Sequence, residues 1–480
     1  AFLGDRLGAF DELVAVLLDG AGDARVAEAF GVVERAKSRS LLDLVQGALD
    51  SPDEHAPAGD GDDAALLDEF ERLRSELNAL YSRMADRLDA EPAAEAQRSA
   101  DIRQREAALA ALESRLASTR GVAGLYARPL DLRAVQARLA ADARLVEYFV
   151  AGEELLAFVV GRHDATVHRR LGTAAALHEH VQQAHFQIRR AMRPGALDGV
   201  RGARLLSDAR RALAVLHERV FAPLREAVAG ARRLVFVPHA ALHAAPLHAL
   251  WDGERSLLER FECVYAPSAS LLASPTRRTG AASGASGLGA GGTARALVVG
   301  VSDEHAPHIE AEARRVAGVL GATEPLIGAA ANVDAVSAAA RDADVIHLAA
   351  HGHFSAQNPM ASGVRLGDRW LTVRDIYRLR LRSRLVVLSG CETGRSVIGR
   401  GDELLGLVRG FFAAGTSGLL VSLWMVNDES AAELMEEFYA AARYDRDGGA
   451  AAALRAAQLS MLARRPHPYH WAPFLLLGDV

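Results

Sequence analysis

The sequence predicts an α/β protein whose main part is a doubly wound, mostly parallel sheet with helices on both faces. From residue 296 onward, short apolar runs alternate with amphipathic helical patterns, which is the order of βαβ units. The runs are nearly continuous, as expected of parallel strands that are buried on both faces. The chain has 480 residues and is 50% hydrophobic, so it is long and apolar enough for more than one core.

The strands and helices of this part follow one another in a regular order. The strand patterns are ALVVGV, DVIHLAAHG, RLVVLSGC, SGLLVSLW and APFLLLGD, with helical patterns between them. Between the second and third strands, residues 360–376 indicate a small hairpin at the end of the sheet. We therefore expect strands at 296–301, 344–352, 384–391, 417–424 and 472–479, and helices near 310–320, 333–340 and 402–414 and between 429 and 464.

An α+β subdomain is predicted over residues 131–278. It begins with three short strand patterns separated by turns and continues with two amphipathic helices and two further strands. The strands are expected within 145–171, 233–250 and 261–268, and the helices at about 174–192 and 203–228.

A low-complexity, glycine-rich stretch at 279–294 follows this subdomain. Its glycines mimic half of a dinucleotide-binding fingerprint, but that fingerprint must follow a strand and open a helix, whereas these glycines precede the strand at 296–301. We expect a flexible linker here, followed by the α/β core over 295–480.

Residues 1–120 are predicted to be helical. Between residues 64 and 88, apolar residues recur at spacings of four and three with charges between them, which is typical of a coiled-coil seam. A second such helix covers about 98–118, so the two are expected to form a hairpin. Helices that simply pack together explain the pattern; the alternative is an arm that binds a regulatory protein partner.

Composition limits the classes of function. Lys plus Arg (55) nearly balance Asp plus Glu (61), and no basic stripe carries interleaved aromatics, so we expect no nucleic-acid partner. No apolar stretch approaches the roughly 20 residues of a membrane helix. Two cysteines exclude a disulfide framework and favour the cytoplasm. The start at Ala1 rather than Met is typical of a processed or excised chain.

Two predicted strands end in a reactive side chain. His351 and then Gly352 follow one, and Cys391 in the sequence SGCETG follows the next long strand. The carboxyl ends of neighbouring parallel strands share one sheet edge, so the imidazole and the thiol are expected to meet. A histidine can remove the proton of a thiol or stabilise its anion, which suits acyl transfer. The backbone N–H groups of Gly352 and Cys391 are candidate oxyanion donors.

The other cysteine and the other histidines are interpreted structurally. Cys263 lies inside a predicted strand, and His347 is expected to be buried under the site. His347, His351 and His353 share one side of a strand, but no carboxylate or cysteine ligand lies beside them, so we expect no metal. The remaining histidine clusters are expected on loops and helix surfaces: His178, His180 and His185, and His239, His243 and His248.

Several longer motifs resemble the CHAT family, which comprises caspase-like cysteine peptidases related to separases and often fused to tetratricopeptide repeats. The motifs are HLAAHGHF, VVLSGCETG, GDELLGLVRGFFAAG, SGLLVSLWMVND and HPYHWAPFLLLGD. Upstream, VPHAALHAAPLHAL and YAPSASLL also resemble the family, and VVERAKSRSLLDLV resembles the helix that follows its repeats. The resemblance covers residues 131–480 well and implies a caspase-like core.

At matching positions, the resemblance implies that Cys391 is the nucleophile, His351 the general base or imidazolium partner and Gly352 an oxyanion donor. The chain departs from the family at Gly390, where Ala is usual, and at His239, where Asp is common. The implied function is a cysteine endopeptidase that cleaves protein substrates, needs no cofactor and is regulated by a partner or signal. The alternative is a catalytically silent scaffold that acts through protein–protein interaction.

A candidate specificity residue lies beyond a later strand. Asp428 follows the apolar run that ends at Trp424, so its carboxylate is expected near the same mouth, where it could pair with a substrate Arg or Lys. The alternative role for Asp428 is the N-cap of a helix that opens at Glu429.

Overall fold

The structure is a computed structural model. It describes residues 2–19, 22, 25–37, 72, 76, 104, 105, 108, 130–193, 195–272, 295–303, 306–321, 324–353, 362–389, 402–426, 428–444 and 449–478. None of the helices in these ranges is both long enough and apolar enough to cross a membrane.

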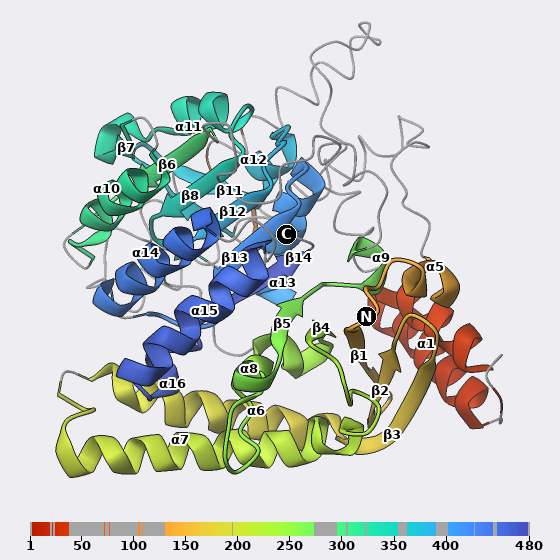
Figure 1. Ribbon diagram of the computed structural model, residues 1–480. Coiled ribbons are helices and arrows are strands. Elements are labelled where there is room, and N and C mark those ends of the chain that lie inside the picture. The colour runs from red at the N-terminus through yellow and green to blue at the C-terminus, as the bar shows by residue number, and fades with distance from the viewer. Residues whose placement is uncertain are drawn as a thin grey trace, which may run out of the picture.

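The described residues are organised around one sheet of eleven strands and a separate three-stranded sheet, whose strand β9 follows β8 along the chain (Figure 1). In spatial order the large sheet contains β3 (Ala165–Thr173), β2 (Glu154–Val160), β1 (Ala143–Ala151), β4 (Arg233–Val237), β5 (Glu262–Tyr265), β14 (Phe474–Gly478), β13 (Gly418–Ser422), β12 (Leu385–Leu388), β8 (Val345–Ala349), β6 (Ala296–Gly300) and β7 (Leu326–Ile327). The small sheet contains β11 (Trp370–Thr372), β10 (Gly363–Arg365) and β9 (Gly352–His353).

The C-terminal half of the large sheet is doubly wound, as the alternation of apolar runs and helices predicts. Strands β7, β6, β8, β12 and β13 are parallel, and only β14 runs antiparallel to β13. Helices cover both of its faces (Figure 1). They are α10 (Ile309–Leu320), α14 (Asp428–Tyr444) and α15 (Gly449–Arg464) on one face and α11 (Val333–Ala340), α12 (Val373–Arg378) and α13 (Asp402–Ala414) on the other.

The N-terminal half of the sheet is also buried on both faces. Alternate residues of β1 enter two different cores, because successive side chains of a strand point to opposite faces. Val146 and Tyr148 pack toward α6 (Ala174–Arg189) and α7 (Gly199–Val220). Leu145 and Phe149 pack toward α1 (Phe2–Asp19) and the helix at 25–37. The two halves therefore have the same layered construction.

The helix at 25–37 is tied to the sheet by buried charges. The ammonium of Lys37, the only lysine of the chain, lies 2.9 Å from a carboxylate oxygen of Glu147 on β1. The carboxylate of Glu34 accepts the first two N–H groups of α9 (Ala269–Leu272), at 3.0 and 2.6 Å. This helix thus contacts both β1 and the segment that leads into the linker.

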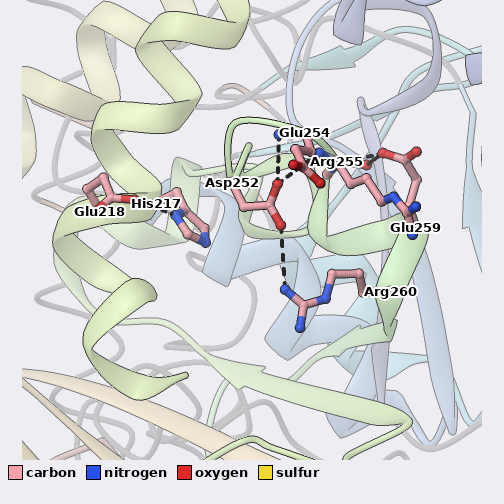
Figure 2. A network of polar contacts seen from close by, with 8 residues as sticks. His217, Glu218, Asp252, Glu254, Arg255, Glu259 and Arg260 are labelled. Carbon is pink, nitrogen blue, oxygen red and sulfur yellow. Dashed lines mark hydrogen bonds and ion pairs between the residues drawn. The ribbon is translucent and has the colours of Figure 1, made fainter. Parts of the chain in front are cut away.

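A turn stabilised by one aspartate precedes α8 (Leu257–Arg260) (Figure 2). Asp252 accepts the N–H groups of Glu254 at 2.9 Å and Arg255 at 2.8 Å, and its other oxygen lies 3.5 Å from Arg260. Partial burial raises the pKa of Asp252, but the two N–H donors together with the nearby His217 and Arg260 hold that pKa below its usual value. These contacts stabilise the turn before α8, and none of them involves a predicted site residue.

The sequence prediction of the coiled-coil hairpin falls mostly on residues outside the described ranges. The few described residues within 64–88 and 98–118 are helical, and Arg105 lies 3.1 Å from Glu76. The predicted linker at 279–294 also lies outside the described residues.

The strands of the predicted α+β subdomain and those of the predicted α/β core form one sheet, because β14 lies between β5 and β13. One expectation is corrected by the structure. His185 and His248 were expected at helix-surface and loop positions, yet they are only 4% and 2% exposed. His185 lies 2.6 Å from the carbonyl of Ala244, and His248 lies 2.8 Å from the hydroxyl of Tyr265, so each buried ring has a polar partner.

Candidate active site

The carboxyl ends of β6, β8 and β12 meet at one edge of the sheet. Leu348 of β8 pairs with Leu388 of β12, and Ala349 pairs with Gly300 of β6. The ladders continue beyond the strands, because Ser389 donates its N–H to Leu348 at 3.1 Å. Residues that directly follow these three strands are therefore held side by side.

His351 lies directly beyond β8, where the sequence predicts it. Its carbonyl accepts the N–H of Arg365 at 2.7 Å, which fixes its backbone against β10. Its side chain is 22% exposed, so the ring is sheltered but accessible.

Gly352 opens β9 and pairs with Val364 of β10. Because the adjacent N–H of Arg365 bonds to His351, the pair Gly352–Val364 is the non-hydrogen-bonded kind. The N–H of Gly352 therefore points away from β10. This is the orientation that an external acceptor requires.

An acidic residue that the sequence analysis did not single out lies against His351. Oδ2 of Asp303, on the loop after β6, is 2.9 Å from Nε2 of His351. The two atoms are at ion-pair distance but are not aligned as a hydrogen bond. Asp303 follows a strand end, as His351 does, and this was the available signal.

A buried polar network lies directly beneath these strand ends. Glu312 on α10 accepts a hydrogen bond from the hydroxyl of Ser389, and its carboxylate lies 3.3 Å from Nε2 of His347 on β8. Nδ1 of His347 lies 3.1 Å from the hydroxyl of Tyr439 on α14. The prediction that His347 is buried under the site is confirmed, since its side chain is 0% exposed.

The remaining predicted site residues are placed only in part. Cys391 and Gly390 lie outside the described residues, and Ser389 is the last described residue before them. Asp428 is the first residue of α14, which begins one residue earlier than predicted, and its side chain lies outside the described part. The structure thus brings together His351, Gly352 and the strand end that precedes Cys391.

The three histidines of this region have different neighbours. His347 contacts Tyr439 and Glu312, whereas the ring of His353 packs against Trp370 with centroids 5.7 Å apart. Within the described ranges, no group of three or more His, Cys, Asp or Glu side chains could hold a metal ion.

Cys263, the other cysteine, is a core residue, as predicted. It lies in β5 and is 8% exposed, with its sulfur 3.7 Å from the carbonyl of Phe261. Burial raises the pKa of its thiol well above the usual value, so this sulfur stays protonated at neutral pH. Cys263 is therefore unsuited to nucleophilic chemistry.

Comparison with known families gives one match over most of the C-terminal part. A family model described as the CHAT domain matches residues 210–479, which is more than half of the chain. The matched range contains His351, Gly352 and Cys391.

Two curated proteins are similar in sequence. Tetratricopeptide repeat protein 28 of Homo sapiens is 28% identical over 213 residues, which cover 36% of this chain and 8% of that protein. The protein of the same name from Mus musculus is 27% identical with the same coverage. The chain thus matches about 8% of the length of these curated relatives.

Among solved structures, the chain is similar to one in the crystal structure of the Saccharomyces cerevisiae separase–securin complex. The TM-score is 0.57 at 9% identity, and the match covers 95% of this chain and 34% of that chain. At this identity the likeness concerns the fold. The predicted fold class, a mostly parallel sheet with helices on both faces like that of caspases and separases, is confirmed.

Proposed function

The chain belongs to the CHAT domain family, and from this premise we propose that it is a cysteine endopeptidase in which His351 and Cys391 form the reactive pair. The observation that carries the proposal is the pairing of β8 with β12, whose carboxyl ends adjoin. Cys391 is two residues beyond Ser389, so their Cα atoms are at most about 7 Å apart. Within this bound, the thiol could reach the ring that follows the neighbouring strand.

In the proposed reaction, the thiol of Cys391 transfers its proton to the imidazole of His351, and the resulting thiolate attacks the carbonyl carbon of the substrate. The C–S bond forms while the carbonyl π pair moves to oxygen. The N–H of Gly352, which points away from β10, and the N–H of Cys391 would stabilise this oxyanion.

The intermediate then collapses, the C–N bond breaks, and the departing amine takes the proton from the imidazolium. Water next attacks the thioester and gives a proton to His351, the C–S bond breaks, and the carboxylic acid leaves as the thiol is restored. One water is consumed, and the cycle needs neither an oxidant nor a metal.

Asp303 would orient the imidazole and stabilise its protonated form. Its contact at Nε2 leaves Nδ1 of His351 to exchange the proton with the thiol. The two side chains are not aligned as a hydrogen bond in this state, and catalytic hydrogen bonds often tighten only when substrate binds.

Asp428 is proposed as a specificity residue. It begins α14 in the connection that follows β13, the strand beside β12, so its carboxylate would face the same sheet edge. A carboxylate there would select a substrate Arg or Lys. The predicted alternative, an N-cap of a helix that opens at Glu429, does not match α14, because Asp428 is its first helical residue.

Regulation by a protein partner is supported by two relatives. One solved structure with this fold is a separase–securin complex, and the curated relatives are named for tetratricopeptide repeats. The helix at 25–37 contacts β1 and α9, so a partner bound to the N-terminal helices would act on the sheet directly. We propose that these helices receive the regulatory partner.

The test is covalent labelling by a peptidyl acyloxymethyl ketone that ends in Arg, read by intact mass. We expect one label on the wild-type chain and none on Cys391→Ala or His351→Ala. The matched control is Cys263→Ala, which removes the other cysteine and should keep the label.

Cleavage of a fluorogenic peptide library should follow the same pattern. A Cys391→Ala protein that still cleaves peptides would refute the proposed function. A wild-type Cys391 that reacts no faster than a free thiol at neutral pH, with no cleavage, would favour the scaffold alternative.

A further inference from the structure

Glu312 is a buried carboxylate that the reaction above does not use. It lies on α10, is 5% exposed, and faces the underside of the sheet edge that carries the candidate site. Moving a carboxylate out of water costs several kcal/mol unless its oxygens gain strong partners. The partners of Glu312 therefore indicate what this residue does.

Its two described partners come from the two strands that precede the reactive residues. The hydroxyl of Ser389 donates to Oε1 of Glu312, and Ser389 is two residues before Cys391. Nε2 of His347 lies 3.3 Å from the same oxygen, and His347 is four residues before His351 on β8. One oxygen of Glu312 on α10 thus contacts both the residue that follows β12 and a residue of β8.

The network is also fixed at its far side. Nδ1 of His347 lies 3.1 Å from the hydroxyl of Tyr439 on α14. Burial, together with the nearby Glu312 carboxylate, raises the pKa of Tyr439 well above its usual value, so its hydroxyl keeps the proton that it can donate. Nε2 of His347 faces the same carboxylate at ion-pair distance but is not aligned with it as a hydrogen bond.

We propose that Glu312 is a positioning residue: one of its oxygens accepts the hydrogen bond of Ser389 and lies against His347, and so holds β12 and β8 at the separation that Cys391 and His351 need for proton exchange. This inference rests on the proposed function. Ser389 is the last described residue in the backbone ladder between the two strands, so its side-chain bond to Glu312 lies at the end of the described pairing, two residues before Cys391 in sequence. A misplacement of about 1 Å can cost about 100-fold in rate, so a modest loosening is measurable.

The experiment compares Ser389→Ala and Glu312→Gln with Ser383→Ala. Ser383 lies before the other end of β12, is 0% exposed, and donates to Thr416 at 3.1 Å. Ser383 is therefore also a buried serine that flanks β12 and donates a side-chain hydrogen bond, but it flanks the end of β12 that is remote from the site. Ser389→Ala keeps the test valid if Glu312→Gln does not fold.

With a fluorogenic peptide that the wild type cleaves, we expect Ser389→Ala and Glu312→Gln to lower kcat by about 10- to 100-fold, with KM changed by less than about threefold. In both variants, the acidic limb of the pH profile of kcat should move toward alkaline pH, because the imidazole of His351 no longer stabilises the thiolate of Cys391 fully. Ser383→Ala should stay within about twofold of wild type. Retention of the wild-type kcat and pH profile in both site variants would overturn the inference and leave the proposed function intact.

If the wild type cleaves no peptide, the proposed function fails. The positioning role of Glu312 is then tested by a second measurement, the reactivity of the Cys391 thiol. The pH dependence of iodoacetamide labelling at Cys391 is measured by peptide mass, since Cys263 is buried. The midpoint of the labelling rate against pH should rise by about 1 pH unit or more in Ser389→Ala and Glu312→Gln but not in Ser383→Ala, and this result would support the positioning role. Identical midpoints in all four proteins would overturn it.

Discussion

The carboxylate of Asp303 lies 2.9 Å from the imidazole of His351, although the two residues are 48 positions apart and follow different strands. Strands β6, β8 and β12 are consecutive in space, so the loops after them supply an acid, a base and, by the proposal above, a thiol. The order of strands in the sheet, rather than the order along the chain, creates this arrangement.

Removal of Asp303 should slow the reaction without weakening substrate binding. We expect Asp303→Ala to lower kcat by about 10- to 100-fold, less than the roughly 10⁴-fold loss known for a buried triad aspartate, because Asp303 is 45% exposed. Steady-state kinetics on a fluorogenic peptide measure this.

The matched control for Asp303 is Asp344→Ala. Asp344 accepts the N–H of Arg295 at 3.0 Å at the opposite end of β6 and β8, so its loss should leave kcat unchanged. Equal kcat values for Asp303→Ala and wild type would show that the acid does not act on His351.

The buried pair of Lys37 and Glu147 should contribute more to stability than an exposed pair of the same length. Burial, reinforced by Glu34, raises the pKa of Glu147, and Lys37 opposes this effect. Lys37→Met leaves the buried carboxylate without its cation, and Glu147→Gln leaves the buried ammonium without its anion, so each is expected to cost about 3 kcal/mol.

The exposed comparison pair is Arg232 and Asp142, also 2.9 Å apart. Arg232→Met should not change the melting temperature measurably. Thermal unfolding of the wild type, Lys37→Met, Glu147→Gln and Arg232→Met tests whether breaking the buried pair costs more than breaking the exposed pair. A Lys37→Met protein as stable as Arg232→Met would contradict this expectation.

Acid should destabilise the protein through its buried histidines. Burial lowers the pKa of His248 to about 4, against about 6.5 in an unfolded chain. Between these values the unfolded state binds a proton that the folded state does not, so stability is complete above pH 6.5 and falls as the pH drops toward 4. From pH 8 to pH 5 the loss from this residue is about 2 kcal/mol.

The measurement is the free energy of unfolding in urea between pH 8 and pH 5, for wild type and His248→Gln. The variant should have a shallower pH slope whatever its absolute stability. Parallel slopes would mean that His248 does not titrate differently in the folded state.

A methyl group at Gly300 should push α10 away from the sheet. A Cβ there would lie 2.7 Å from Cβ of Ala313, which is closer than real Cβ atoms approach. Gly300→Ala should therefore cost about 1–3 kcal/mol and reduce kcat, because α10 carries Glu312. Gly318→Ala, on α10 with nothing within 4 Å, should instead stabilise by about 1 kcal/mol. Circular dichroism melts and peptide cleavage distinguish the two, and equal melting temperatures would refute the packing argument.

The sequence was a good guide to the elements of the fold and a poor guide to their neighbours. Continuous apolar runs predicted the parallel strands, and the structure has α11 at the predicted residues 333–340. An apolar run does not show which strands pair with one another, however. The insertion of β14 between β5 and β13 depends on a register between Leu477 and Tyr265, which are far apart in the chain.

The same limit explains which site residues could be predicted. His351 and Gly352 were found because a reactive residue directly follows an apolar run. Asp303 was missed because its contact depends on β6 lying beside β8, with β7 on the outer side, although β7 comes between them in sequence. Glu312 has the position of an ordinary acidic residue in the first turn of a helix, and only the packing of α10 reveals its burial.

Strand β14 has a consequence for how the molecule is made. Its residues, 474–478, are the last of the described strands to be synthesised, and they join the strand that pairs with β4 to the strand that pairs with β12. During translation the sheet must therefore exist as two separate pieces. The half that holds the helix at 25–37 and the half that holds His351 are joined into one sheet only by β14, so a nascent chain that still lacks β14 also lacks the continuous sheet through which its N-terminal helices would reach the site.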